Sequence, residues 1–210
     1  MKTNQDYKNA ALAAMKGNWA QCVLATFAVV AITLVANILT AADPEGSTSI
    51  VSLAVAICVT MPLSVGLYAA YRALYHGTNL KVAENAFKTG FGNWGHHVGG
   101  MLLMSVYTFA WTLLLIVPGV IKSFSYALTP FILTDKPELS ANEAIELSMK
   151  MMDGHKLDLF VLYLSFFGWY LLSFLTLCIG ILWVVPYQYT TMVAFYEDIK
   201  AEYESKAVVA

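Results

Sequence analysis

The sequence predicts an all-α, polytopic membrane protein with a single integral membrane domain over residues 1–210. Of the 210 residues, 59% are hydrophobic and 12% are charged, and the mean hydropathy is +0.63. Soluble domains carry about 25% charged residues, so this composition excludes a soluble enzyme. Two further observations support the prediction: the chain has long stretches without a charge, and its basic residues collect on one side of them.

The first two uncharged stretches predict a hairpin of membrane helices. Residues 17–42 and 46–71 carry no charge, and about 20 apolar residues of helix cross the hydrocarbon core. We therefore expect crossings over residues 18–41 and 50–73, joined by the acidic turn Asp43–Gly46. The polar start before Trp19 is too long for a signal peptide, so the first crossing is expected to remain as an anchor.

Two longer stretches predict two more hairpins. Between residues 89 and 134 the only charge is Lys122, and residues 159–196 carry none. Each stretch is too long for one crossing, so we expect helices over 96–117 with 119–134, and over 157–178 with 181–197. Pro118-Gly119 and Gly180 mark the predicted turns. The helix over 119–134 is short and contains Pro130, which leaves open whether it crosses fully, tilts or breaks.

The distribution of basic residues predicts the orientation. Eleven of the twelve Lys and Arg residues lie on one side of the predicted hairpins, either in the segments before, between and after them or, for Arg72, at the very end of the second crossing. Lys122 is the exception. The positive-inside rule makes their side the cytoplasm. Both termini are therefore expected to be cytoplasmic, and very little of the chain is expected outside.

Charge and cysteine content exclude other classes of protein. The net charge is −2, which provides no surplus of positive charge for nucleic acid. The three cysteines, Cys22, Cys58 and Cys178, lie in apolar runs without a CxxC spacing, so neither a disulfide framework nor a zinc site is indicated. No motif for a cofactor is present, and none is expected.

An internal repeat accompanies the three hairpins. A short amphipathic helix precedes each hairpin and ends at Gly17, Gly92 or Gly154, where glycine is a natural C-cap. The return helices also match: aligning Gly119 with Gly180 places Tyr126 over Tyr187, Thr129 over Thr190 and Asp135 over Tyr196, while Pro62 and Pro186 hold similar places. We expect three parallel pseudo-repeats over residues 1–75, 80–135 and 140–200, each with a cytoplasmic interfacial helix. A coincidence of apolar composition is the alternative.

The clearest local signal is a capping box at Ser140 and Glu143. It predicts a helix that begins after Ser140 and has Ala144, Leu147, Ser148 and Met151 on one face. That face fits either a membrane-surface or partner-binding helix, or a helix packed beneath the bundle as a structural floor.

The stretch from Ile116 to Tyr196 carries a family resemblance. The motifs are Pro118-Gly119 with Lys122-Ser123, Ser140-Ala-Asn-Glu143, Gly154-His-Lys156 and Trp183 to Pro186-Tyr187. Together they resemble an uncharacterised family of bacterial multi-pass inner-membrane proteins of unknown function. More distantly, they are similar to the membrane domain of some glycerophosphodiester phosphodiesterases. The resemblance to the family implies a location in the bacterial inner membrane and no assigned reaction. The activity of those phosphodiesterases is not implied, because their catalytic domain is missing here.

Lys122 is the sharpest candidate for a binding site, since a charge inside the bilayer is costly and marks function by default. One reading places Lys122, Ser125, Tyr126, Tyr187 and Gln188 in a polar patch between the fourth and sixth helices, where a lipid phosphate or small anion would bind. In the other, Lys122 lies close enough to the outer surface to snorkel.

Three histidines form a remote alternative. His96, His97 and His155 are expected at the cytoplasmic ends of their helices, where convergence would suit a divalent metal. Their spacing matches no metal motif, so interfacial hydrogen bonding is the alternative, and no metal site is expected.

These observations predict a non-catalytic integral membrane protein rather than an enzyme. We expect a role in envelope or lipid organisation, or as an accessory to another membrane complex. A small transporter or lipid-handling protein that uses the Lys122 patch is the alternative. The expected partners are membrane lipids, with another membrane protein or a second copy of the chain as further options, and no nucleic acid.

Overall fold

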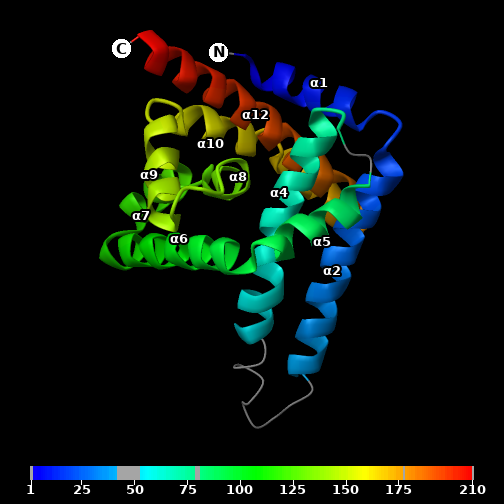
Figure 1. Cartoon of the computed structure of the whole chain (residues 1–210). Coiled ribbons are helices and arrows are strands. Elements are labelled where there is room, and N and C mark those ends of the chain that lie inside the picture. The colour runs from blue at the N-terminus through cyan, green and yellow to red at the C-terminus, as the bar shows by residue number, and fades with distance from the viewer. Residues whose placement is uncertain (1, 42–52, 79–80, 177, 210) are drawn as a thin grey trace.

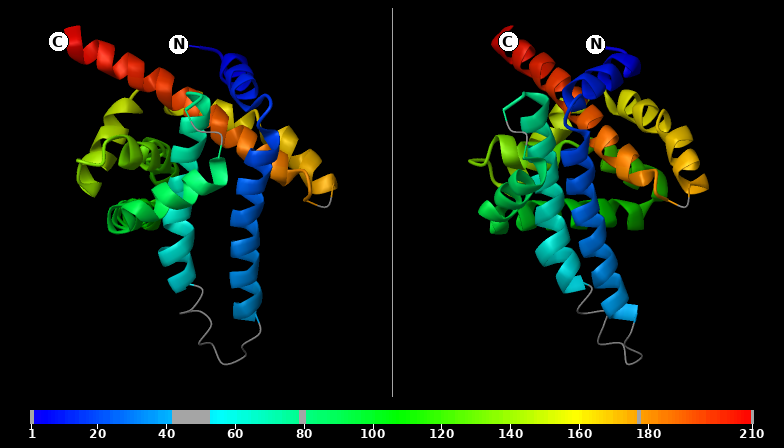
Figure 2. Two further views of the ribbon diagram at one scale, coloured as in Figure 1. Left: turned by 45° about the vertical axis from the view of Figure 1, so that its right-hand side comes forward. Right: turned by 90° about the vertical axis from the view of Figure 1, so that its right-hand side faces the viewer.

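The computed structural model describes residues 2–41, 53–78, 81–176 and 178–209, and every regular element within these ranges is a helix. In Figures 1 and 2, α2 and α4 run together along the long axis of the molecule, and both chain termini lie beyond the same end of these two helices. The predicted turn at Asp43–Gly46 lies outside the described residues. The predicted all-α class is confirmed for the described part of the chain.

The N-terminal region is a short helix that bends sharply into a long one. The Asp6 carboxylate accepts a hydrogen bond from the Thr3 backbone N–H at 2.8 Å, and the Thr3 hydroxyl caps the start of α1 (Asn4–Met15). Gly17 has a φ of +82°, a conformation that glycine adopts without a steric penalty. The chain therefore turns by 99° between α1 and α2 (Trp19–Ala41).

Glycines bring α4 and α5 into backbone contact. A π-helical turn, η1 (Ala56–Thr60), leads into α4 (Met61–Tyr75), which packs against α5 (Val82–Gly92). A Cβ atom on Gly90 would lie 2.5 Å from the carbonyl oxygen of Pro62, and one on Gly66 would lie closer still to the carbonyl of Ala86. Small residues at both positions thus permit the close helix pairing typical of membrane bundles.

The second hairpin turns three residues earlier than predicted. α6 (Trp94–Leu114) is followed by Leu115, whose extended backbone (φ −159°, ψ 134°) separates it from α7 (Ile116–Ser125). Pro118 lies in the first turn of α7, where its missing N–H costs no helical hydrogen bond. Gly119 instead provides close packing, because a Cβ there would lie 2.6 Å from the Thr112 Cα. The prediction of a turn at Pro118-Gly119 was therefore wrong.

The predicted helix over 119–134 is broken. α7 ends at Ser125, a turn follows, and α8 (Thr129–Asp135) begins with Pro130 in its first turn. Proline favours the start of a helix over its interior, so the chain restarts there. The break leaves α8 free to pack its buried residues Phe131, Ile132 and Leu133 into the core.

The third hairpin follows the predicted capping box. The Glu143 carboxylate accepts from the Ser140 backbone N–H at 2.8 Å at the start of α9 (Ala141–Met151). Gly154, with a φ of +84°, then leads into α10 (Lys156–Leu164) and α11 (Phe167–Leu175), and Gly180 immediately precedes α12 (Ile181–Val209). The capping box is confirmed, as are the left-handed glycines at 17 and 154. α5 also ends at Gly92 as predicted, but Gly92 has no positive φ.

The number of membrane-spanning candidates is smaller than the six expected. Four segments of the described residues are long and apolar enough to cross a bilayer: Leu53–Tyr75, Trp94–Leu114, Ile116–Asp135 and Lys156–Leu175. The bent pair of α1 and α2 brings the number to five if it forms one span. α12 is not among them, since its apolar start at Ile181 runs into the charged segment after Tyr196. In Figure 1, α6 lies across α4 rather than beside it.

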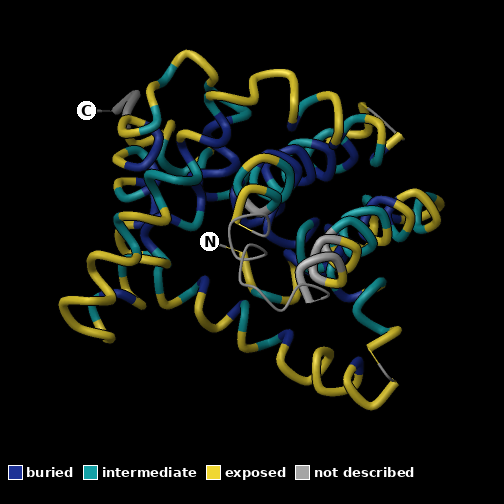
Figure 3. Tube along the Cα trace, turned by 90° about the horizontal axis from the view of Figure 1, so that it is seen from below, coloured by how far each residue is buried: buried dark blue, intermediate teal, exposed yellow. Residues whose placement is uncertain are grey.

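The core lies where the return helices meet, and the periphery is apolar. In Figure 3 the outer segments are largely exposed. The buried core includes Tyr71 of α4, Phe131 of α8 and Phe195 of α12. By contrast, Leu113 on α6 is 77% exposed and Phe174 on α11 is 72% exposed. Such extended apolar surface is unusual for a soluble monomer and fits contact with lipid tails.

Candidate functional site

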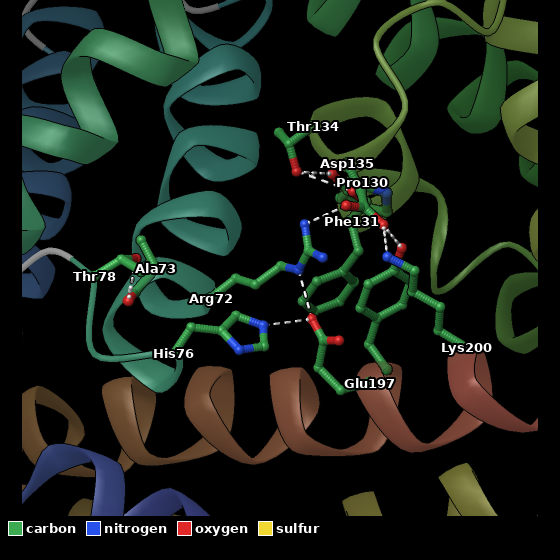
Figure 4. Close-up of polar contacts among 11 residues, drawn as sticks. Arg72, Ala73, His76, Thr78, Pro130, Phe131, Thr134, Asp135, Glu197 and Lys200 are labelled. Atoms are coloured by element: carbon green, nitrogen blue, oxygen red, sulfur yellow. Dashed lines mark hydrogen bonds and ion pairs between the residues drawn. The ribbon is translucent and has the colours of Figure 1, made fainter.

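The densest polar cluster of the described chain lies where α4, α8 and α12 meet (Figure 4). We call it the junction cluster and define it as Arg72, His76, Asp135, Tyr196, Glu197 and Lys200. Arg72 and His76 come from the last turn of α4 and the residue that caps it, and Asp135 is the last residue of α8. The other three come from the middle of α12. Each helix thus contributes to one site near its end or at the point where its apolar part stops.

Arg72 is the centre of the junction cluster. Its Nη1 lies 2.5 Å from an Asp135 oxygen, and its Nε lies 2.5 Å from a Glu197 oxygen. Its guanidinium carbon lies 5.6 Å from the centre of the Tyr196 ring. Arg72 is the only arginine in the sequence, and a planar guanidinium with five donors is suited to holding two carboxylates at once.

The two carboxylates have further partners. Asp135 accepts from Lys200 Nζ at 2.6 Å and from the Tyr196 hydroxyl at 2.7 Å. Glu197 lies 3.0 Å from His76 Nε2. Two cations, Arg72 and Lys200, therefore face two anions, and this balance makes the cluster a neutral clamp between three helices.

A hollow of about 450 Å³ adjoins the clamp. Arg72 and His76 line it, together with hydroxyl and amide groups of Thr78, Asn85, Thr89 and Thr134. Most of these groups are already engaged: Thr89 donates to Asn85 at 3.1 Å, and Thr78 donates to the Ala73 carbonyl at 2.9 Å. The hollow is polar, but its donors and acceptors largely satisfy one another.

A second polar contact ties α1 to α12. The Tyr7 hydroxyl donates to Asp198 at 2.7 Å, and Lys2 Nζ lies 3.4 Å from the same carboxylate. Burial raises the pKa of Asp198, but the hydrogen bond from Tyr7 and the contacts with Lys2 outweigh it and hold that pKa below its usual value. Asp198 is consequently ionised at neutral pH and holds the N-terminal helix on α12.

The predicted patch around Lys122 is divided between different partners. Lys122 Nζ lies 5.1 Å from the centre of the Trp111 ring and 3.8 Å from the Met149 sulfur on α9. Ser125 donates to the carbonyl of Ile121 at 3.0 Å, within its own helix. Lys122 therefore contacts the helix that the sequence predicts on the cytoplasmic side, rather than only lipid at the outer surface.

The α12 members of the patch have aromatic neighbours. The Tyr187 ring packs edge-on against Phe166 with centroids 5.2 Å apart, and Gln188 accepts a hydrogen bond from Tyr170. Tyr126 is buried beside Tyr107, with ring centroids 6.4 Å apart. Within the described residues, no hydrogen bond, ion pair or ring contact joins Lys122, Ser125 or Tyr126 to Tyr187 or Gln188.

The three histidines are distributed over two places. His97 is buried and its Nδ1 lies 2.9 Å from the carbonyl oxygen of Gly90, and His96 lies beside it with ring centroids 5.9 Å apart. His155 instead lies near α12, with its Nε2 3.4 Å from a carboxylate oxygen of Glu202. No group of three or more His, Cys, Asp or Glu residues suited to a metal ion occurs in the part of the chain that the structure describes.

The sequence contained a signal for the junction cluster that its local motifs did not reveal. Asp135 and Tyr196 lie at equal distances after Gly119 and Gly180, and Arg72 and Tyr196 lie at equal distances after Pro62 and Pro186. Arg72, Asp135 and Tyr196 thus occupy matching places in the three return helices. Only their convergence in the fold shows that these matching places form one site.

Comparisons with known proteins identify a family and no activity. The model of a family described as "Protein of unknown function (DUF975)" matches residues 49–203. No curated protein and no solved structure matches the chain.

Proposed function

We propose, starting from the fact that the chain belongs to the DUF975 family of proteins of unknown function, that it is a non-catalytic integral membrane protein. Its role would be envelope or lipid organisation, or service as an accessory to another membrane complex. We place it in the bacterial cytoplasmic membrane with both termini in the cytoplasm. The distant likeness to phosphodiesterase membrane domains stays a prediction and brings no reaction to this chain.

The observation that carries this proposal is the closed state of the junction cluster. Asp135 is held by Arg72, Lys200 and Tyr196, and Glu197 by Arg72 and His76. A general base or nucleophile must be free to take a proton or attack a substrate. Carboxylates held this tightly by cations are suited to fixing helices in place instead.

Six crossings in three pseudo-repeated hairpins remain our proposal for the topology. Equivalent packing in the second and third hairpins supports it: Gly119 packs on Thr112, Gly180 packs on Ser173, and each pair is seven residues apart. The positive-inside rule supports the cytoplasmic location of the termini. The position of α6 across α4 makes the second hairpin the critical test of this topology.

Cysteine labelling from outside intact cells tests the topology. In a chain whose three native cysteines are replaced by alanine, Glu45→Cys and Leu115→Cys should react with a membrane-impermeant maleimide, and Ser205→Cys should react only after lysis. If Leu115→Cys is protected while Glu45→Cys is labelled, the second hairpin does not cross and the six-span proposal fails.

The lipid composition of cells tests the absence of catalysis. Overproduction of the wild type and of Asp135→Asn should give the same lipid species in membrane extracts. A new or depleted lipid species seen with the wild type and absent with Asp135→Asn would identify an enzyme and refute the proposal.

A small transporter or lipid-handling protein is the second candidate. It is favoured by two hollows between the apolar helices. Within the described chain, neither hollow is lined by a charged residue or by a member of the junction cluster. Native mass spectrometry of the detergent-purified protein compares the two candidates. A lipid or solute retained by the wild type favours handling, and its loss in Lys122→Met would locate the site at the predicted patch. A second polypeptide retained in its place favours the accessory role.

A further inference from the structure

Two adjoining hollows lie among the apolar helices, away from the junction cluster. The larger one measures about 650 Å³ and lies between α4, α6, α7 and α8; the smaller one measures about 310 Å³ and lies along α12. Tyr68 of α4 and Tyr163 of α10 line both of them. These two rings therefore form a wall that the hollows share, and we refer to the pair of adjoining hollows as one tyrosine-walled space.

The lining of this space combines hydroxyl groups with apolar side chains. In the larger hollow, Met101, Met104 and Phe109 provide the apolar wall, and Ser64, Ser105 and Thr108 provide hydroxyls. These hydroxyls donate to carbonyls of their own helices, as Ser105 does to Met101 and Thr108 to Met104, each at 2.8 Å. None of the described residues that line either hollow carries a charged side chain.

Tyr163 offers this space a hydroxyl donor that has no acceptor among the described residues. The Tyr163 ring packs against Phe124, with centroids 6.3 Å apart, but its hydroxyl makes no hydrogen bond to any other described residue. A phenol in apolar surroundings normally finds a partner for its O–H. A bound molecule with an oxygen acceptor would supply it.

These features define the ligand by its chemistry. A charged group would lose its hydration here without meeting an opposite charge, so it is disfavoured. An alkyl chain would gain contacts with the methionine and phenylalanine side chains. A carbonyl oxygen at the head of that chain would accept from Tyr163.

We infer that this space holds one acyl chain of a membrane glycerolipid, with the ester carbonyl of that chain hydrogen-bonded to Tyr163. The inference deepens the lipid-handling candidate above and gives its site and ligand class. The same ester is offered by an uncharged diacylglycerol and by a phospholipid whose phosphate stays outside. Both sources share the chemistry that Tyr163 recognises.

The test uses photoreactive lipids and the full-length protein in detergent micelles. A diacylglycerol and a phosphatidylglycerol, each with a diazirine early in one acyl chain, are crosslinked to the protein and the adducts are mapped by peptide mass spectrometry. Adducts on Met101, Met104 or Tyr163 are expected. Labelling by the diacylglycerol alone identifies a neutral lipid, labelling by phosphatidylglycerol alone identifies a bilayer phospholipid, and labelling by both identifies the shared ester.

Three variants make the test specific. Tyr163→Phe removes the hydroxyl and keeps the ring, and should lower the yield of these adducts about fivefold, as expected for one lost hydrogen bond. Ser105→Trp fills the larger hollow and should reduce the adducts there to background. Tyr75→Phe removes a hydroxyl from a tyrosine of α4 that lines neither hollow, and should leave the yield unchanged.

The inference is overturned if Tyr163→Phe labels as well as the wild type, or if adducts spread evenly over the lipid-facing helices in both the wild type and Ser105→Trp. Either result would leave the non-catalytic proposal standing. That proposal rests on the junction cluster and is tested separately by the lipid composition of cells.

Discussion

Replacing Gly90 by alanine should separate α4 from α5. The new Cβ would lie 2.5 Å from the Pro62 carbonyl oxygen, whereas ordinary contact begins at 3.4 Å, so one backbone must move by about 0.9 Å. The obstacle is backbone, which cannot rotate away as a side chain can. A gap of 0.5–1 Å already forfeits about a quarter to a half of a dispersion contact.

The magnitude follows from two opposing terms. Overpacking of this kind costs about 3 kcal/mol at the upper end of its usual range, while alanine is better than glycine in a helix by about 1 kcal/mol. We therefore expect Gly90→Ala to lower the free energy of unfolding by about 2 kcal/mol, which corresponds to a melting temperature about 4–8 °C lower for a chain of this size.

Gly99→Ala is the matched control, because a Cβ at Gly99 meets no atom within 4 Å. It should keep the helix-propensity gain and melt at or slightly above the wild-type temperature. Thermal denaturation of the two variants in the same detergent, followed by size-exclusion chromatography with tryptophan fluorescence, measures the difference. If Gly90→Ala is as stable as Gly99→Ala, the backbone contact between α4 and α5 does not stabilise the fold and the reasoning is wrong.

Three further outcomes are expected. Arg72→Met should destabilise the chain by about 3 kcal/mol in chemical denaturation, because Asp135 and Glu197 lose their shared cation. Lys88→Met, which removes an exposed ion pair, should leave the stability almost unchanged. The depressed pKa of Asp198 means that its stabilising contact is complete above the unfolded-state pKa of about 3.9 and is lost as pH falls through the lower folded-state value. Hydrogen exchange of the α1 amides, corrected for intrinsic rates, should therefore accelerate over that acidic window in the wild type. The step should be smaller in Asp198→Asn, where the Asp6 carboxylate at the start of α1 still titrates. Ser140→Ala should lower stability by about 1 kcal/mol and raise exchange in the first turn of α9 alone; unchanged exchange there would mean that the capping box contributes nothing.

Much of the secondary structure was predictable because its signals are local. The box of Ser140 and Glu143 acts over three residues, and the hinges at Gly17 and Gly154 depend on one backbone conformation each. The turn of the second hairpin was not predictable in this way. The dipeptide Pro118-Gly119 is compatible with a turn and equally with the start of a helix, and in the structure it starts α7 beside Thr112. The packing of Gly119 on Thr112 is a tertiary contact, and the dipeptide sequence alone does not predict it.

Of the candidate sites, too, one was visible in the sequence and the others were not. Lys122 was singled out because a lone charge in an apolar run is visible in any sequence, yet its neighbours Trp111 and Met149 come from two other helices. The junction cluster joins residues more than 60 positions apart, and the hollow behind Tyr163 is formed by several helices at once.

By itself the sequence determined that the chain is helical and apolar enough for a membrane, and where helices such as the one after Ser140 begin. These properties follow from composition and from interactions within a few residues, which hold whatever the rest of the chain does. Only the tertiary structure decided that Arg72, Asp135 and Tyr196 meet, that α4 and α5 touch through glycine, and that Tyr163 lines two uncharged hollows. Such pairings depend on which helix faces pack together, and that choice is made by the shapes of the whole bundle rather than by any one segment.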